Sequence, residues 1–274
     1  MKQQKARRLI GCLVVTVGLL GLNYPFLAGV VNDLFAYREL QGYQTELQNT
    51  DDEELTQTLE TARAYNEALS SGGSLTEFED FPLLQTDALL GYVELPQIGV
   101  YMAVRYGTEN EVLKQCCGLV ADTSLPVGGE STHAVISGHT GMASKKMLTD
   151  LTQMQTGDIF FLHSLGQDMA YQVDQIIVVE PWDVDELGIV KGEDYVTLLT
   201  CTPYGVNDHR LLVRGSRIGY DFSSGLTGQQ GSVMRYSTVE RLRMAIAAVS
   251  GLCFVGMIIA LLRSGKQKRQ DRSI

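Results

Sequence analysis

A cysteine, a histidine and an arginine in this sequence are of the types that could form and resolve a thioester. Cys201 ends the apolar run "YVTLLTC", and Arg210 follows it across a loop that contains Pro, Gly and Asn. His139 stands in "AVISGHTG", 62 positions before the cysteine (201 − 139 = 62). A thiol attacks a carbonyl group as the thiolate, which a neighbouring imidazolium or guanidinium stabilises, and a guanidinium can also stabilise an oxyanion. These residue types indicate acyl transfer.

A structural interpretation of the same residues is also open. A lone cysteine in an apolar strand is usually a small core residue. Arg210 could be a solvated strand residue, as could Arg214 and Arg217. Spacing alone therefore does not distinguish a reactive Cys201 from a structural one. Three further histidines are interpreted as structural or surface groups: His133, His163 and His209.

The chain has five cysteines, which is few for a disulfide scaffold. Cys12 and Cys253 fall within long apolar runs. Cys116 and Cys117 are adjacent, and because a disulfide across so short a loop is strained, we interpret both as small buried residues. A disulfide between Cys201 and one of that pair is the alternative to a free thiol. Since no P-loop, GxGxxG or metal-type Cys/His spacing is visible, neither a cofactor nor a metal ion is predicted.

The elements that must position these residues are mostly short β-strands. From residue 91 onward the apolar period is close to two, which predicts strands in seven segments: "GYVELP", "VYMAVRYG", "THAVISGH", "DIFFLHS", "MAYQVDQIIVVEP", "YVTLLTC" and "HRLLVRGSRI". "SLGQDM" predicts a hairpin turn, and "NEVLKQCCG" and "KKMLTDLTQM" are short helical candidates. Seven or eight such strands predict a mainly β fold, a closed barrel with short flanking helices. Neighbouring strand ends in that barrel would bring Cys201 and His139 together.

A polar, helical region is predicted before the barrel. "TDDEELTQTLETARAYNEALS" predicts a helix that begins at a capping box formed by Thr50 and Glu53. Its apolar residues recur near helical spacing, so one face is expected to pack on the domain. "SSGGS" predicts the end of this helix and a connection over residues 70–87, where a hinge or lid could lie.

Two uncharged apolar runs, residues 9–31 and 244–262, are long enough to cross a hydrocarbon core. Basic residues precede the first run and follow the second, so the positive-inside rule predicts cytoplasmic termini and an extracellular middle. The first run could also be a signal peptide, although it is longer than usual and no A-x-A-like site follows. The predicted organisation is a basic tail (1–8), a membrane helix or signal-anchor (9–31), a helical and lid-equivalent region (32–89), a barrel (90–220), a linker (221–243), a membrane helix (244–262) and a basic tail (263–274).

Charge is divided in the same way along the chain. Residues 1–8 and 241–274 hold 11 Lys and Arg and 1 Asp, which leaves 11 basic (22 − 11) and 31 acidic (32 − 1) residues for 9–240. The predicted outer region therefore has a net charge near −20 (11 − 31). Such an acidic surface argues against nucleic acid as a partner.

The segments that carry these residues resemble the sortases, in particular the class C, pilin-polymerising branch of Gram-positive bacteria. "TLLTCTPYGVNDHRLLVRG" is similar to the family's cysteine segment and downstream arginine, and "TSLPVGGESTHAVISGHTG" to its histidine segment. "GYVELPQIGV" resembles the first barrel strands. The resemblance covers roughly residues 90–218 and implies an eight-stranded β-barrel.

The resemblance also implies a role for each residue. Cys201 would be the nucleophile, His139 the acid/base that protonates the leaving amine, and Arg210 the group that orients substrate and stabilises the oxyanion. The implied reaction cleaves an LPxTG-like sorting signal and passes the acyl group to an amine, which in class C is a lysine of the next pilin. The implied partners are pilins or other surface proteins with sorting signals, and the implied location is the cell membrane.

One part of the class C pattern is absent. Many class C enzymes place an Asp-Pro-aromatic motif over the cysteine, whereas the equivalent stretch here reads "EFEDFPLL". Asp80 and Phe81 are the candidate lid residues, with Pro82 after the aromatic residue instead of before it. A lid that leaves the site open is the alternative.

Two other functions stay open at this point. One is a sortase that anchors proteins to the cell wall, with a cell-wall precursor as the amine. The other belongs to a different class: a non-catalytic, membrane-tethered adhesin or scaffold, in which Cys201 is unreactive. A general cysteine protease fits less well, because no Asn or Asp partner for the histidine is identifiable.

Overall fold

The computed structural model describes residues 2–142, 145–224 and 251. Contacts divide the chain into one unit of residues 1–31 and 236–274 and a second unit of residues 32–235. The second unit contains all the strands of the described residues and all the residues proposed above for chemistry.

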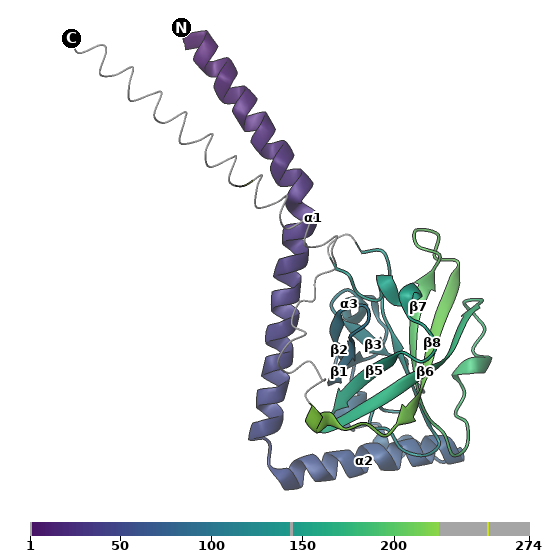
Figure 1. The fold of residues 1–274 in the computed structure, drawn as a ribbon. Coiled ribbons are helices and arrows are strands. Elements are labelled where there is room, and N and C mark those ends of the chain that lie inside the picture. The colour runs from purple at the N-terminus through teal and green to yellow at the C-terminus, as the bar shows by residue number, and fades with distance from the viewer. Residues whose placement is uncertain (1, 143–144, 225–250, 252–274) are drawn as a thin grey trace. The chain divides into compact units, whose positions relative to one another are not determined.

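Eight strands of the described chain close into a barrel, as predicted (Figure 1). The neighbours around the barrel follow the order β1-β2-β3-β4-β7-β8-β6-β5. Two of the neighbouring pairs, β2 with β3 and β4 with β7, are parallel, and the others are antiparallel. The strands are β1 (Leu89–Leu95), β2 (Val100–Tyr106), β3 (Cys117–Leu119), β4 (Thr132–Ser137), β5 (Ile159–Ser164), β6 (Gln167–Val179), β7 (Asp194–Thr202) and β8 (His209–Ile218).

The strand that the periodicity did not resolve is β3. The segment "NEVLKQCCG" was predicted as a short helix, and it forms α3 (Asn110–Leu113) followed by the first residues of β3. A strand of three residues is too short to show an alternation of period two. The predicted hairpin turn is confirmed, because Leu165 and Gly166, both at positive φ, join β5 to β6.

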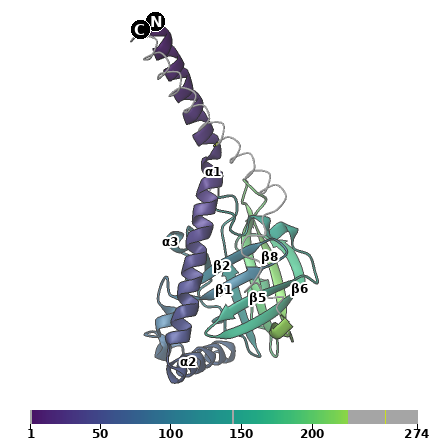
Figure 2. The ribbon, with the colours of Figure 1, turned by 60° about the vertical axis from the view of Figure 1, so that its left-hand side comes forward.

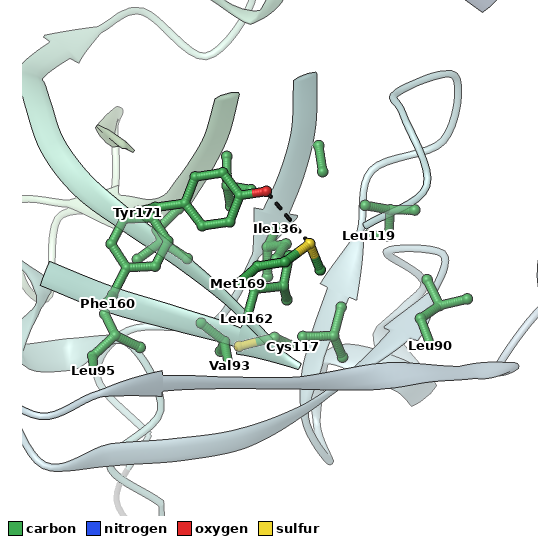
Figure 3. Packing of buried hydrophobic residues seen from close by; sticks show 14 of the residues in the cluster. Leu90, Val93, Leu95, Cys117, Leu119, Ile136, Phe160, Leu162, Met169 and Tyr171 are labelled. Atoms are coloured by element: carbon green, nitrogen blue, oxygen red, sulfur yellow. Dashed lines mark hydrogen bonds between the residues drawn. The ribbon is translucent and has the colours of Figure 1, made fainter. Parts of the chain in front are cut away.

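The barrel interior is a close-packed apolar core (Figure 3). Phe160 of β5 and Tyr171 of β6 stack with their ring centroids 5.7 Å apart, and the Tyr171 hydroxyl donates to the sulfur of Met169. Gly215 of β8 lies beside them, and a Cβ there would come within 2.5 Å of the Phe160 ring. Truncation of a ring such as Phe160 to alanine typically costs about 3–5 kcal/mol.

Two long helices precede the barrel: α1 (Lys2–Asn49) and α2 (Asp52–Ser71). Leu40 and Tyr43 of α1 pack with Tyr92 and Ala103 of β1 and β2, and the part of α1 from residue 32 onward runs beside these strands in Figure 2. The face of α2 that carries Ala62 and Tyr65 joins the barrel core, as the helical spacing predicted. Two further short helices are η3 (Thr149–Gln153), where "KKMLTDLTQM" predicted a helix, and η4 (Asp185–Leu187).

The predicted capping box of α2 is wrong by one residue. Asp51 is the N-cap, and its side chain accepts a hydrogen bond from the backbone N–H of Glu53. Thr50 instead donates from its hydroxyl to the carbonyl of Glu46, at the end of α1. The preceding helix thus takes the hydroxyl that the sequence pattern assigned to the next one.

The connection between α2 and β1 folds into two short 3₁₀ helices, η1 (Thr76–Phe78) and η2 (Pro82–Leu84). Phe78 is buried with its ring edge on Tyr65 of α2. Near the end of the connection, the Asp87 carboxylate pairs with Arg105 of β2, which also contacts Glu39 of α1. Arg105 therefore joins this connection to α1 and to the barrel.

In the residues that the structure describes, no helix combines the length and the apolar character that a membrane crossing needs. The predicted span over residues 9–31, which forms part of α1, is therefore not confirmed. The predicted span over residues 244–262 lies outside the described residues, apart from position 251.

Candidate active site

Cys201 and Arg210 are direct partners in the antiparallel pairing of β7 and β8. Cys201 is the penultimate residue of β7, and Arg210 is the second residue of β8. The loop that joins them turns tightly, because the N–H groups of Val206 and Asn207 both donate to the carbonyl of Pro203, at 3.1 and 2.9 Å. Because the loop is short, Arg210 lies beside Cys201 in the neighbouring strand.

His139 reaches the same level from the other side of β7. Strands β4 and β7 pair in parallel with a constant offset of 62 residues, from Thr132 with Asp194 to Ser137 with Leu199. The same offset separates His139 from Cys201. The pairing extends past the end of β4, because the N–H of Gly138 donates to the carbonyl of Leu199 at 3.0 Å. His139 is the residue that directly follows this hydrogen bond.

Strand alternation directs the side chains of Cys201 and Arg210 to one face of the sheet. In β7, Leu198 enters the core, so Cys201 lies on the opposite, outer face. Directly paired residues share a face, which puts Arg210 on the outer face too. In β4, Ile136 enters the core, and His139 follows two residues after the end of this strand. His139, Cys201 and Arg210 thus lie at the neighbouring ends of β4, β7 and β8, and these three residues are called the row below.

The three cysteines of the barrel differ in their surroundings. All are free thiols, so Cys201 is not disulfide-bonded to Cys116 or Cys117. Cys201 is half-buried, whereas the other two are buried, as predicted. Burial raises the pKa of Cys116 to about 12, and it also raises the pKa of Cys117. The buried pair is therefore protonated and shielded at neutral pH, and Cys201 is the most accessible candidate nucleophile among the three.

The guanidinium of Arg210 is held by the loop that precedes it. Its Nη1 donates to the carbonyls of His209 at 3.0 Å and Asn207 at 3.3 Å. The ring of Tyr204 in the same loop lies beside Gly141, where a Cβ would be 3.3 Å from Cε2 of the tyrosine. The loop after β7 and the loop that carries His139 are thus in contact.

The loop after His139 is anchored at several points. The carbonyl of His139 accepts from the N–H of Leu148 at 3.1 Å, and the N–H of Gly141 donates to the hydroxyl of Thr149 at 3.0 Å. The ammonium group of Lys145 donates to two carbonyls that follow α3, at 2.9 and 3.0 Å. These bonds restrict where the backbone of His139 can lie.

The other histidines take structural or surface positions, as predicted. His133 is buried between the carbonyl of Gly188 and the hydroxyl of Thr197, at 2.9 and 2.7 Å, and burial lowers its pKa. His163 is buried beside Asp168, with Nδ1 2.5 Å from the carboxylate. His209 is half-buried at the start of β8, and its hydrogen bond to Asp208 raises its pKa.

The two predicted lid residues lie in different environments. Phe81 packs against the main core cluster, and Asp80 is exposed between η1 and η2. In the described part of the chain, no three His, Cys, Asp or Glu side chains are grouped to hold a metal ion.

Two residues beside the row, Thr200 and Gly138, were not identified from the sequence. Thr200 is buried on the inner face of β7, and its hydroxyl donates to the carbonyl of Gly138 at 2.7 Å. Alternation in β7 puts Thr200 on the face opposite Cys201, but its partner depends on the β4–β7 register, which the sequence does not reveal. The chemistry available to the row is nucleophilic attack by a thiol, with a proton donor on one side and a cation on the other.

The chain is similar to several proteins of one family. The family model of the sortase domain matches residues 93–218. A sortase A of Bacillus anthracis is 23% identical over 80% of this chain and 98% of its own length. A sortase C of Clostridium perfringens, solved with the C-terminal cell wall sorting motif, is 43% identical over 68% of this chain and 100% of that chain, with a TM-score of 0.65. A sortase C of Streptococcus pneumoniae is 40% identical over 67% of this chain and 97% of that chain, with a TM-score of 0.60.

Proposed function

Because the chain belongs to the sortase family of cysteine transpeptidases, we propose that it cleaves an LPxTG-like sorting signal and joins the acyl group to a pilin lysine. The observation that carries this proposal is the row of His139, Cys201 and Arg210 across β4, β7 and β8. The similarity of about 40% to sortases C, one of them studied for its pilin substrate specificity, supports the polymerising branch.

In the first half-reaction, the Cys201 thiolate attacks the carbonyl carbon of the threonine in the signal. Negative charge develops on the carbonyl oxygen, where the guanidinium of Arg210 donates hydrogen bonds. The C–N bond then breaks, and its electron pair stays on the nitrogen. The imidazolium of His139 gives this nitrogen a proton, so the glycine amine leaves and a thioester remains on Cys201.

In the second half-reaction, the lysine amine of the acceptor attacks the thioester carbonyl carbon. His139, now neutral, takes the proton that this amine loses. The C–S bond breaks, and its electron pair restores the Cys201 thiolate. The products are an isopeptide bond between the two subunits and the enzyme in its starting state.

The proposal includes where the reaction takes place. We propose that residues 9–31 and 244–262 anchor the chain in the cell membrane with the barrel outside. Their length, lack of charge and basic flanks support this arrangement, as does the net charge of about −20 for residues 9–240. Surface proteins with sorting signals would meet the row of three residues there.

The test incubates the full chain with a purified pilin that carries an LPxTG-type signal and its acceptor lysine. A ladder of covalent multimers is expected with wild type and not with Cys201→Ala. A pilin whose acceptor lysine is replaced by arginine is the matched control and gives no ladder. Transfer only to a cell-wall precursor amine would identify an anchoring enzyme, and the absence of any covalent product would contradict both transfer reactions.

A further inference from the structure

Gly138 lies between the end of β4 and His139, and β7 binds both of its backbone polar groups. Its N–H donates to the carbonyl of Leu199 at 3.0 Å, and its carbonyl accepts from the Thr200 hydroxyl at 2.7 Å. Thr200 is 2% exposed, so water has little access to replace this hydroxyl. The two partners of Gly138 thus immediately precede Cys201.

The opposite side of Gly138 leaves no space for movement. A Cβ at this position would lie 2.8 Å from the side chain of Leu148 and 3.1 Å from the sulfur of Cys117. The N–H of Leu148 also binds the carbonyl of His139 at 3.1 Å. The segment is therefore packed between Leu148 and β7, and the Thr200 hydroxyl fixes it on the β7 side.

We propose that Thr200 is a positioning residue, whose hydroxyl sets the place of His139 relative to Cys201. The inference rests on the proposed roles of these two residues and adds a residue that acts through them. One strand then supplies the nucleophile from its outer face and the support for the acid/base from its inner face. The thiol and the imidazole are kept in register because Thr200 and Cys201 are neighbours.

Removal of the hydroxyl leaves the Gly138 carbonyl buried without this partner, which favours a shift of the backbone toward a new one. A displacement of about 1 Å between reacting groups can lower a rate by roughly 100-fold. For Thr200→Val, which keeps the shape of the side chain, we therefore expect a kcat lower by about 10- to 100-fold. We expect KM to stay within roughly twofold, because the hydroxyl faces away from the substrate side.

The test compares Thr200→Val with Thr200→Ser in the full chain, using an internally quenched LPETG peptide. Serine keeps the hydroxyl, so its kcat should stay within about threefold of wild type. Thr197→Val is the matched control, since Thr197 is a second buried threonine of β7 with a hydrogen bond, to His133. It should lower the melting temperature but leave kcat unchanged. The pH profile of kcat should move for Thr200→Val and not for Thr197→Val.

Each outcome decides the proposal. Equal losses of kcat in Thr200→Val and Thr197→Val, with unmoved pH profiles, would reduce Thr200 to a general structural role. If Thr200→Val does not fold, Thr200→Ala and Thr200→Ser are compared, and equal kcat values for these two overturn the proposal. If wild type does not cleave the peptide, the proposed function fails separately. The pH dependence of Cys201 alkylation then tests Thr200, and identical profiles for wild type and Thr200→Val reject it.

Discussion

His139 and Cys201 are separated by the same 62 residues that offset β4 from β7, and the hydrogen bond from Gly138 to Leu199 extends this parallel pairing to the residue before His139. Arg210 joins the row through its direct pairing with Cys201. The placement of Cys201 and Arg210 therefore depends on a strand ladder, and that of His139 depends also on the loop that carries it. Substitutions of the side chains themselves should change catalysis while leaving the barrel stable.

Arg210→Ala should lower kcat by roughly 10²- to 10³-fold, since it removes the cation next to the developing oxyanion. Arg210→Lys should recover only part of the loss, because an ammonium group lacks the planar fork of donors. Steady-state cleavage of an LPxTG peptide measures both. Arg214→Lys is the control: Arg214 also lies in β8, but it pairs with Asp174 at 3.0 Å. An Arg214→Lys variant as impaired as Arg210→Lys would contradict the assignment.

Alkylation should distinguish the thiols of the barrel. Iodoacetamide at neutral pH is expected to modify Cys201 much faster than Cys116 and Cys117, because the latter two are buried and burial raises their pKa values. Mass spectrometry of proteolytic peptides after timed labelling identifies each site. Equal labelling of Cys116 and Cys201 in the folded protein would contradict this, and a urea-unfolded sample provides the reference in which all react.

His133 should make stability depend on pH. Burial lowers its pKa in the folded state below the ordinary value of 6.5, so below about pH 6.5 the unfolded chain binds the proton more readily. The contribution is fully present above pH 6.5 and is lost as the pH falls toward the lowered folded-state pKa. Urea unfolding between about pH 7.5 and pH 5.5 measures the free energy. His133→Gln should show a shallower loss across this range, and an unchanged slope would contradict the prediction.

The segment around Phe81 offers a test of the predicted lid. Phe81 packs against the core cluster, so its truncation to alanine removes a contact that holds this segment on the barrel. If the segment covers Cys201, loss of about 1.4 kcal/mol would expose the thiol roughly tenfold more often. The alkylation rate of Cys201 measures this exposure. Asp80→Ala, at an exposed neighbour, is the control, and an unchanged rate in Phe81→Ala would mean that the segment does not cover the site.

Most strands of the barrel could be predicted from the alternation of apolar and polar residues, because these strands are long enough to show a period of two. β6 and β8, with 13 and 10 residues, were both predicted, whereas β3, with three, was missed. The N-cap of α2 was assigned to Thr50 instead of Asp51, because the sequence pattern does not reveal that α1 extends to Asn49 and takes the threonine hydroxyl. Local patterns therefore failed where two elements compete for one group.

The candidate site was predictable in its residues but not in its geometry. Cys201, His139 and Arg210 were identified from their types, their positions at strand ends and the resemblance to sortases. The support of Gly138 by Thr200 was not, because it depends on which strands are neighbours and in which register. Pairing of β4 with β7, two strands that are distant in sequence, is a property of the whole barrel.

The most direct test of the account is the intact mass of the full chain after rapid mixing with an LPxTG peptide in the absence of an acceptor amine. We predict that the mass of the chain increases by the mass of the acyl fragment, which is bound to Cys201. The increase should disappear when the thioester is treated with hydroxylamine. Cys201→Ala should show no increase, and His139→Ala should slow its formation. A wild-type chain that cleaves the peptide without forming this adduct, or an adduct that persists in Cys201→Ala, would contradict the central claim.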